Sequence, residues 1–253
     1  MSLAEFLSKI HSKRPFTPYS MHMLFFPMPV LILGAYLAPS VNWLLLGLLI
    51  IAYWIGLEVG VHNLDLAPGW RPKAGSRWSY APWNLSGEAM WGTASRKFGW
   101  AGMLIGLAIG IYLVCVTQWW VIFFVLVSMA IGIGYGKDIW PFHTYTGFGL
   151  AYGTIPVFGS YLLQVQRFDV ATTYFWGVVL LSMAVGIISS VLLSYLPRAA
   201  NPVAYASVGM ESKDKRYSPT ELESKVMIMK GLFIMFGATW IAVIGAVMMR
   251  VGG

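Results

Sequence analysis

Residues 98–136 read FGWAGMLIGLAIGIYLVCVTQWWVIFFVLVSMAIGIGYG, a stretch without a single aspartate, glutamate, lysine or arginine. A helix needs about 20 mostly apolar residues to cross a hydrocarbon core roughly 30 Å thick. Two such runs fit here, 98–116 and 119–136, and only Thr117 and Gln118 separate them. We therefore predict two antiparallel membrane helices joined by a tight turn.

The rest of the chain repeats this pattern. Of its 253 residues, 58% are hydrophobic and 11% are charged, whereas about 25% of the residues in ordinary soluble domains are charged. Further apolar runs are found at 21–38, 41–62, 147–165, 172–196 and 226–249. The sequence thus predicts an all-α fold, a polytopic transmembrane helix bundle with about seven spans, in a single domain covering residues 1–253.

The N-terminal segment, residues 1–20, does not resemble a cleavable signal peptide, because it has no apolar core and no small-residue cleavage site. Its apolar side chains recur at helical spacing, which favours an amphipathic segment lying on the membrane surface. The only cysteine, Cys115, lies inside an apolar run. This placement is not typical of a disulfide-stapled secreted domain.

Lysine and arginine fall almost entirely on one side of the predicted bundle. The N-terminal tail carries three of them, loop 63–97 five, loop 137–146 one and loop 197–225 five, out of 17 in the chain. Cytoplasmic loops are enriched in these residues. We therefore expect the N-terminus and these three loops to be cytoplasmic, the C-terminus to lie opposite, and the membrane to be a cytoplasmic (inner) one.

The second run ends in GLEVGVHNLDLAPGW, residues 56–70. Glu58 and His62 are four residues apart and share one helix face, and an ionisable residue at membrane depth is a functional candidate because it is costly there. A ligand-binding or catalytic role and a structural Glu58–His62 pair both fit this pattern. Gly56 and Gly60 flank Glu58 and would allow another helix, or a ligand, to approach closely.

Two further polar segments lie at the same side. The sequence IGIGYGKDIWPFHTYTGFG, residues 131–149, breaks its helix with glycines and Pro141. Its Lys137 and Asp138 are candidates for ligand binding or for a local ion pair. Loop 197–225 carries a basic run, Lys213–Arg216, that either holds a phosphate or forms a solvated face. No nucleotide-binding or zinc motif is present.

The stretch GYGKDIWPFHTYTGFGLAYGTIPVFGSYLLQVQRFD, residues 134–169, resembles the middle of the UbiA superfamily of intramembrane aromatic prenyltransferases. The segment HNLDLAPGWRPKAGS, residues 62–76, looks like a degraded form of that family's first acidic loop. The two long loops also occupy the places of the family's two acidic loops. The resemblance covers roughly residues 20–250, although the family usually has nine helices rather than seven.

This resemblance implies a site for a polyprenyl diphosphate held by Mg²⁺, which requires several carboxylate ligands. It places catalytic roles on Glu58, His62 and Asp65, and metal ligation on Glu58 and Asp65. Lys73, Lys137 and Arg198 would grip the diphosphate. The full substrate-binding set is Asn63, Arg71, Lys73, Tyr135, Lys137, Asp138, His143, Arg198 and Asn201.

The sequence departs from the family in its second loop, where no carboxylate occurs between Leu196 and Met210. One complete metal site is therefore missing. This favours a catalytically degenerate UbiA-like protein that binds a lipid, quinone or pigment as a subunit of a larger membrane complex. Its expected partners are membrane lipids and other membrane subunits, and nucleic acid is not among them.

Two alternatives stay open. The first is an active Mg²⁺-dependent prenyltransferase that moves a polyprenyl group from its diphosphate to an aromatic or lipid acceptor. The second is a transporter in which Glu58 and His62 form a proton-linked pair. The sequence contains no inverted repeat and no matched pair of broken helices of the kind that transporters show.

Overall fold

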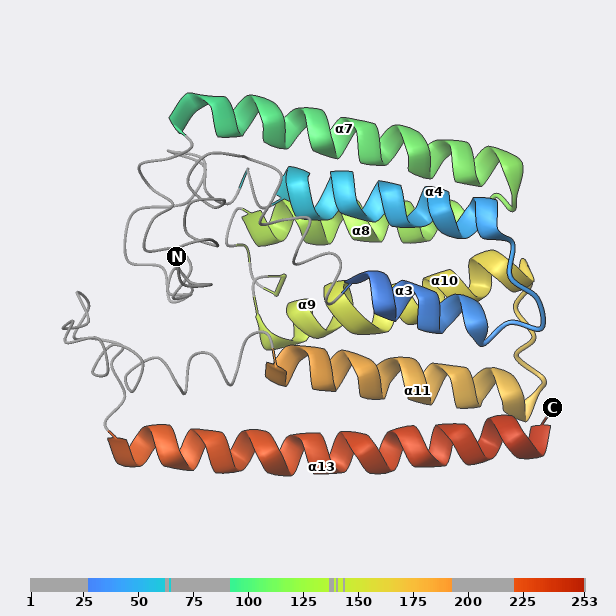
Figure 1. Cartoon of the computed structure of the whole chain (residues 1–253), viewed down its shortest axis with the longest axis vertical. Helices are drawn as coiled ribbons and strands as arrows, with labels where there is room; N and C mark the ends of the chain where they lie inside the picture. Colours follow the sequence, from blue (N-terminus) through green and yellow to red (C-terminus); the bar gives the residue numbers. More distant parts are fainter. Residues whose placement is uncertain are drawn as a thin grey trace, which may run out of the picture.

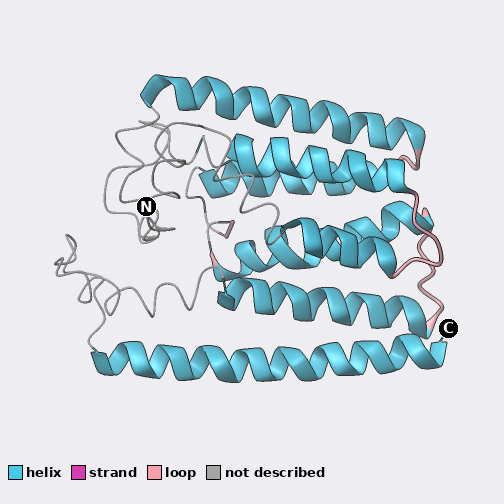
Figure 2. Cartoon of the chain, in the orientation of Figure 1, coloured by secondary structure: helices cyan, strands magenta, loops and turns pink. Residues whose placement is uncertain are grey.

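The computed structural model describes residues 27–61, 64, 92–136, 139, 141–142, 144–192 and 221–252. Every regular element in this part of the chain is a helix, and Figure 2 shows no strand among them. The predicted all-α class is therefore confirmed for the described residues.

One helical rod overlaps each of the seven predicted apolar runs, and three of the rods begin before their run. Two rods combine α-helical and π-helical segments. The second rod ends in a π-helix, and the fifth has a π-helix between two α-helices. The rods are α3 (Pro27–Tyr36), α4 with η1 (Trp43–Tyr53, Trp54–Val61), α7 (Gly92–Val116), α8 (Val121–Gly136), α9 with η3 and α10 (Tyr145–Gly149, Leu150–Thr154, Ile155–Val165), α11 (Thr173–Ser190) and α13 (Glu221–Gly252).

Four of these stretches are long and apolar enough to cross a membrane: Trp43–Val61, Gly99–Val116, Thr173–Ser190 and Ile228–Gly252. The chain is therefore an integral membrane protein. Two other apolar helices, Pro27–Tyr36 and Val121–Tyr135, are shorter than a full span, so a total of seven spans stays a prediction.

The rods lie side by side, with α7 at one edge of the bundle and α13 at the other (Figure 1). Short loops reverse the chain at one end of the bundle, and polar side chains fix them. Asn42 caps α4 by accepting hydrogen bonds from the backbone N–H groups of Leu44 and Leu45. The Asn42 N–H donates to Gln164 Oε1 at 2.6 Å, which ties this loop to the end of α10.

The predicted tight turn at Thr117 and Gln118 is confirmed, because α7 ends at Val116 and α8 begins at Val121. The third reversal follows α10, which ends where Gln166 adopts a left-handed conformation with φ of 52°. Thr172 then caps α11 by accepting a hydrogen bond from the Phe175 N–H at 3.2 Å.

Glycine permits a close contact between η1 and α7. A Cβ added to Gly60 would stand 2.8 Å from the backbone nitrogen of Met103, and one added to Gly102 would stand 2.9 Å from the Cα of Gly60. Small residues allow membrane helices to approach this closely. The expectation that Gly56 and Gly60 admit another helix is confirmed, and that helix is α7.

Helix α13 packs against α11 at a similar contact, where a Cβ on Gly177 would stand 2.6 Å from the carbonyl oxygen of Gly245. Elsewhere its surface is open: the span in Ile228–Gly252 is 12% buried, against 39% for Thr173–Ser190. Large apolar side chains, among them Phe233, Phe236 and Trp240, face outward.

Candidate functional site

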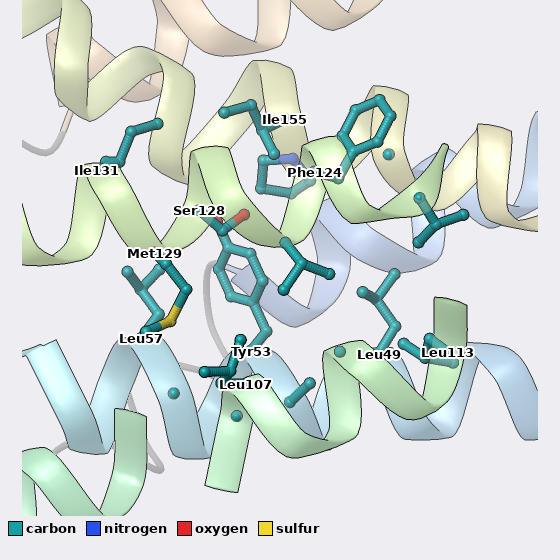
Figure 3. A pocket seen from close by; sticks show the side chains of 18 of the residues that line it. Leu49, Tyr53, Leu57, Leu107, Leu113, Phe124, Ser128, Met129, Ile131 and Ile155 are labelled. Carbon is teal, nitrogen blue, oxygen red and sulfur yellow. The ribbon is translucent and has the colours of Figure 1, made fainter. Parts of the chain in front are cut away.

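A cavity of about 120 Å³ lies in the middle of the bundle, between the α4–η1 rod, α7, α8 and the η3–α10 rod, with α3 contributing one side chain (Figure 3). Its lining residues are Leu31, Leu49, Ala52, Tyr53, Gly56, Leu57, Val61, Met103, Gly106, Leu107, Gly110, Leu113, Trp120, Val121, Phe124, Val125, Ser128, Met129, Ile131, Ala151, Ile155, Pro156, Gly159, Ser160 and Leu163. Ligand sites in helix bundles are commonly placed between the helices in this way.

The cavity is elongated along the helices. Met103 and Leu113, both in α7, line it, as do Val121 and Ile131 in α8. Each pair is ten residues apart, which corresponds to about 15 Å at the rise of an α-helix. The shape therefore suits a chain-like molecule that lies parallel to the helix axes.

The lining is almost wholly apolar. None of the described side chains that line it is charged, and hydroxyl groups come from Tyr53, Ser128 and Ser160. Ser160 donates its hydroxyl to the carbonyl of Leu31 at 2.7 Å, which fastens α10 to α3. Figure 3 shows the Tyr53 ring standing in the cavity with its hydroxyl directed toward Ser128.

Two hydrophobic clusters contain residues that line the ends of the cavity. At the end near the reversing loops, Leu45, Leu113, Val121 and Leu163 pack together with Trp120 against them. At the other end, Val61, Leu64 and Met103 form a buried cluster. This second cluster lies where η1 ends, directly before the segment that carries His62 and Asp65.

Both π-helical segments border the cavity, η1 through Gly56, Leu57 and Val61 and η3 through Ala151. Proline explains η3, because Pro156 has no N–H to donate to the carbonyl four residues earlier and the preceding turn widens. In η1, the glycine contacts with α7 accompany the wider turn. π-Helical turns are frequent at functional sites.

The predicted site residues lie mostly outside the described part of the chain. The backbone of Glu58 belongs to η1, but its side chain is not described. Nothing is described of His62, Asn63, Asp65, Arg71, Lys73, Lys137, Asp138, His143, Arg198 and Asn201. The metal pair of Glu58 and Asp65, the amphipathic segment 1–20 and the basic run Lys213–Arg216 therefore stay predictions.

Tyr135 is the one predicted substrate-binding residue that is described in full. It is half-buried in α8, packs against the Val61–Leu64–Met103 cluster, and meets Phe148 edge to face with ring centroids 5.1 Å apart. It does not line the cavity. Among the described residues, no group of three histidine, cysteine, aspartate or glutamate side chains gathers for a metal ion.

Sequence reasoning missed the cavity and its hydroxyl groups. One signal was present: GMLIGLAIG, residues 102–110, places glycine at every fourth position, in the same pattern as Gly56 and Gly60. Two facing helices with this pattern indicate a close crossing. The pattern says nothing, however, of the space that opens beside that crossing.

No protein-family model matches the chain, and no curated protein and no solved structure matches it. The resemblance to the UbiA superfamily therefore rests on residues 62–76 and 134–169 and on the places of the long loops.

Proposed function

We propose that this chain binds an elongated apolar ligand (a lipid, a quinone or a pigment) in its central cavity and serves as a subunit of a larger membrane complex. The observation that carries the proposal is the cavity itself, about 120 Å³ of space walled by apolar side chains from five rods. An engineered cavity of about 150 Å³ with a similar lining takes up small apolar molecules, so this cavity accommodates a segment of such a ligand rather than the whole molecule.

The hydroxyl groups in the wall suggest what else the ligand carries. Tyr53 and Ser128 lie toward each other across the cavity, and each hydroxyl can donate and accept hydrogen bonds. An oxygen atom of the ligand, such as a quinone carbonyl or a lipid ester, would find a partner there. Together the two hydroxyl groups make this part of the wall its polar part, which suits a ligand with one polar atom better than a pure hydrocarbon.

The role as a subunit is supported by α13. Between Val226 and Val251 this helix presents a row of large apolar side chains outward, including Phe233, Phe236 and Trp240. Phe236 and Trp240 also pack edge to face with centroids 6.3 Å apart. Such a surface suits contact with other membrane subunits as well as with lipid tails.

Loss of catalysis is supported by the second long loop. A diphosphate leaves readily when Mg²⁺ and cationic side chains neutralise its charge. Between Leu196 and Met210 the loop offers Arg198 and Asn201 but no carboxylate. An arginine does not ligate Mg²⁺, and one amide oxygen without a carboxylate does not complete a site for it.

A second candidate function is active prenyl transfer, and one contact favours it. Leu64 is fully buried against Val61 and Met103. Its neighbours in the sequence, Asn63 and Asp65, belong to the remnant of the first acidic loop, and its contacts Val61 and Met103 line the cavity. A donor whose diphosphate lay at this loop would place its chain in the cavity.

We further propose seven spans, a cytoplasmic N-terminus and a C-terminus on the opposite side. The seven rods occupy the seven apolar runs, and loops 63–97 and 197–225 carry most of the cationic residues. An inner-type membrane with an anionic cytoplasmic surface fits this charge distribution.

The experiment that tests the proposal is native purification in mild detergent, followed by mass spectrometry of extracted lipids and of co-purifying chains. We expect one hydrophobic compound enriched above the bulk lipids in near-stoichiometric amount, together with a constant set of partner chains. Purification as a lone chain that carries only bulk bilayer lipids would contradict the proposal.

A further inference from the structure

The two halves of the cavity differ in chemistry. In Figure 3, Ile131, Met129 and Leu57 lie toward one end, Ser128 and Tyr53 lie in the middle, and Leu49, Leu113 and Phe124 lie toward the other end. The end that contains Leu49, Leu113 and Phe124 is lined by aliphatic and aromatic side chains and by glycine. Among the described residues, the only hydroxyl group there belongs to Ser160, which donates a hydrogen bond to the Leu31 carbonyl. This end suits the far end of an apolar tail.

Trp120 is the largest side chain at this end. It lines the cavity and packs against the cluster of Leu45, Leu113, Val121 and Leu163. Its ring meets Phe124 at a centroid distance of 6.3 Å and Phe168 at 4.5 Å. The indole therefore separates the cavity from the loop that contains Phe168.

The position of Trp120 in the chain makes it replaceable. It belongs to the turn between α7 and α8, and its carbonyl accepts a hydrogen bond from the Phe123 N–H at 3.0 Å. The neighbouring main-chain bond from the Val121 N–H to the Gln118 carbonyl, also 3.0 Å, closes the same turn. Neither bond uses the indole, so a shorter side chain keeps the start of α8 while lengthening the cavity.

We infer that Trp120 determines the longest apolar tail that the cavity accepts. This inference rests on the proposed function and adds the residue that selects among ligands. Replacing the indole by a smaller group adds the volume of the indole to this end of the cavity. A tail that stops at Trp120 in the native protein then extends by the depth of one aromatic side chain.

The adjacent tryptophan provides a matched control. Trp119 is 71% exposed and packs with Phe123 on the outer surface at a centroid distance of 6.2 Å. It belongs to the same turn and has the same side chain, but it does not line the cavity. Trp119→Ala therefore removes the same volume without changing the cavity.

The test uses the full chain in detergent micelles and a series of benzoquinones whose side chains carry one, two, three or four isoprene units. An equimolar mixture is added, and native mass spectrometry reports which homologue is bound. Because one methylene changes selection in an apolar pocket by about tenfold or more, Trp120→Ala should shift the ratio of the next longer homologue to the preferred one by at least about tenfold. Trp120→Leu should give a smaller shift in the same direction. This variant provides the test of the inference if Trp120→Ala does not yield folded protein.

Three results would overturn the inference. A homologue profile in the Trp120 variants equal to that of the native protein would show that another residue limits the tail. An equal shift in Trp119→Ala would show that the effect does not arise at the cavity. Native protein that binds no homologue of any length would instead overturn the proposed function, and the inference with it.

Discussion

Gly56 and Gly106 bring the backbones of η1 and α7 into direct contact, since a Cβ built on Gly106 would stand 2.7 Å from the Cα of Gly56. Real Cβ atoms essentially never come so near another heavy atom. The contact fixes the spacing of the two helices. Both glycines also line the central cavity, so the same contact sets the width of one of its walls.

Gly106→Ala should therefore destabilise the protein by about 1–3 kcal/mol, the usual cost of forcing a methyl group into a packed site. Thermal unfolding in detergent micelles measures the effect. Gly47→Ala is the matched control, because a Cβ at Gly47 in α4 meets nothing within 4 Å. Alanine favours a helix over glycine by about 0.5–1 kcal/mol, so Gly47→Ala should be neutral or stabilising. Equal melting temperatures for the two variants would contradict this account of the crossing.

Ser128→Phe should empty the cavity of its ligand. Ser128 lines the cavity, so a phenyl group there takes up space that the ligand needs. We expect the amount of the enriched hydrophobic compound per purified chain to fall about tenfold, the effect of a loss of about 1.4 kcal/mol in binding free energy. Mass spectrometry of the extracted lipids measures it.

The control for this variant is Val127→Phe. Val127 precedes Ser128 in α8, is 45% exposed, and does not line the cavity. The bound compound should be retained in this variant. If Val127→Phe lost the compound equally, or if Ser128→Phe kept it, the ligand would have to bind elsewhere.

Ser160→Ala should loosen α3 from α10. The fully buried Ser160 hydroxyl donates to the Leu31 carbonyl across the two helices at 2.7 Å. Interhelical hydrogen bonds in membrane proteins contribute about 0.6 kcal/mol on average and up to about 1.7 kcal/mol, and we expect a loss of stability in this range. Ser182→Ala is the control, because the buried Ser182 hydroxyl donates within its own helix to the Val178 carbonyl at 2.7 Å. A larger loss for Ser182→Ala than for Ser160→Ala would contradict the assignment.

The positions of the helices along the chain were largely predictable, because the hydrophobicity of a segment is read from that segment alone. The run at 98–136 contains two spans and a turn, and α7 and α8 follow it, since a bilayer demands a fixed length of apolar sequence. The tight turn between α7 and α8 was also predictable, because only Thr117 and Gln118 separate the two apolar runs.

The cavity was not predictable from the sequence. Its wall combines side chains from rods that are far apart in the chain, such as Tyr53 in α4 and Ser128 in α8. Apolar periodicity does not distinguish a residue facing lipid from one facing an internal space, since both surroundings are apolar. In the sequence, the ionisable residues Glu58 and His62 indicate a site. Tyr53 and Ser128 each carry a single hydroxyl group, which does not distinguish them from other residues of membrane helices.

Topology follows from the lysines and arginines and gives a direct test. In a background where Cys115 is replaced by serine, we expect Arg71→Cys and Arg250→Cys to be labelled by membrane-impermeant thiol reagents from opposite sides. Arg250 lies in the last turn of α13, at the end of the bundle where α3 passes into α4 (Figure 1). Labelling of both positions from the same side would rule out an odd number of spans between them.

Two measurements test for catalytic activity: the Mg²⁺ dependence of turnover and the effect of Asp65→Asn. If the first acidic loop suffices for chemistry, the purified chain consumes a polyprenyl diphosphate in a Mg²⁺-dependent reaction, and Asp65→Asn abolishes turnover while the melting temperature is unchanged. We expect no release of diphosphate from any donor, with or without Mg²⁺, because the second loop supplies no carboxylate between Leu196 and Met210.

The measurement needs a partner-free preparation, so that a co-purifying enzyme does not supply the activity. Asp169→Asn serves as a control for the loss of one carboxylate, because Asp169 lies in the loop between α10 and α11, where it pairs with Arg167 at 3.6 Å. Turnover that depends on Mg²⁺, disappears in Asp65→Asn and persists in Asp169→Asn would overturn the proposal that catalysis has been lost. It would also mean that Glu58 and Asp65 hold enough Mg²⁺ to neutralise a leaving diphosphate, with cationic side chains such as Arg198 replacing the second metal.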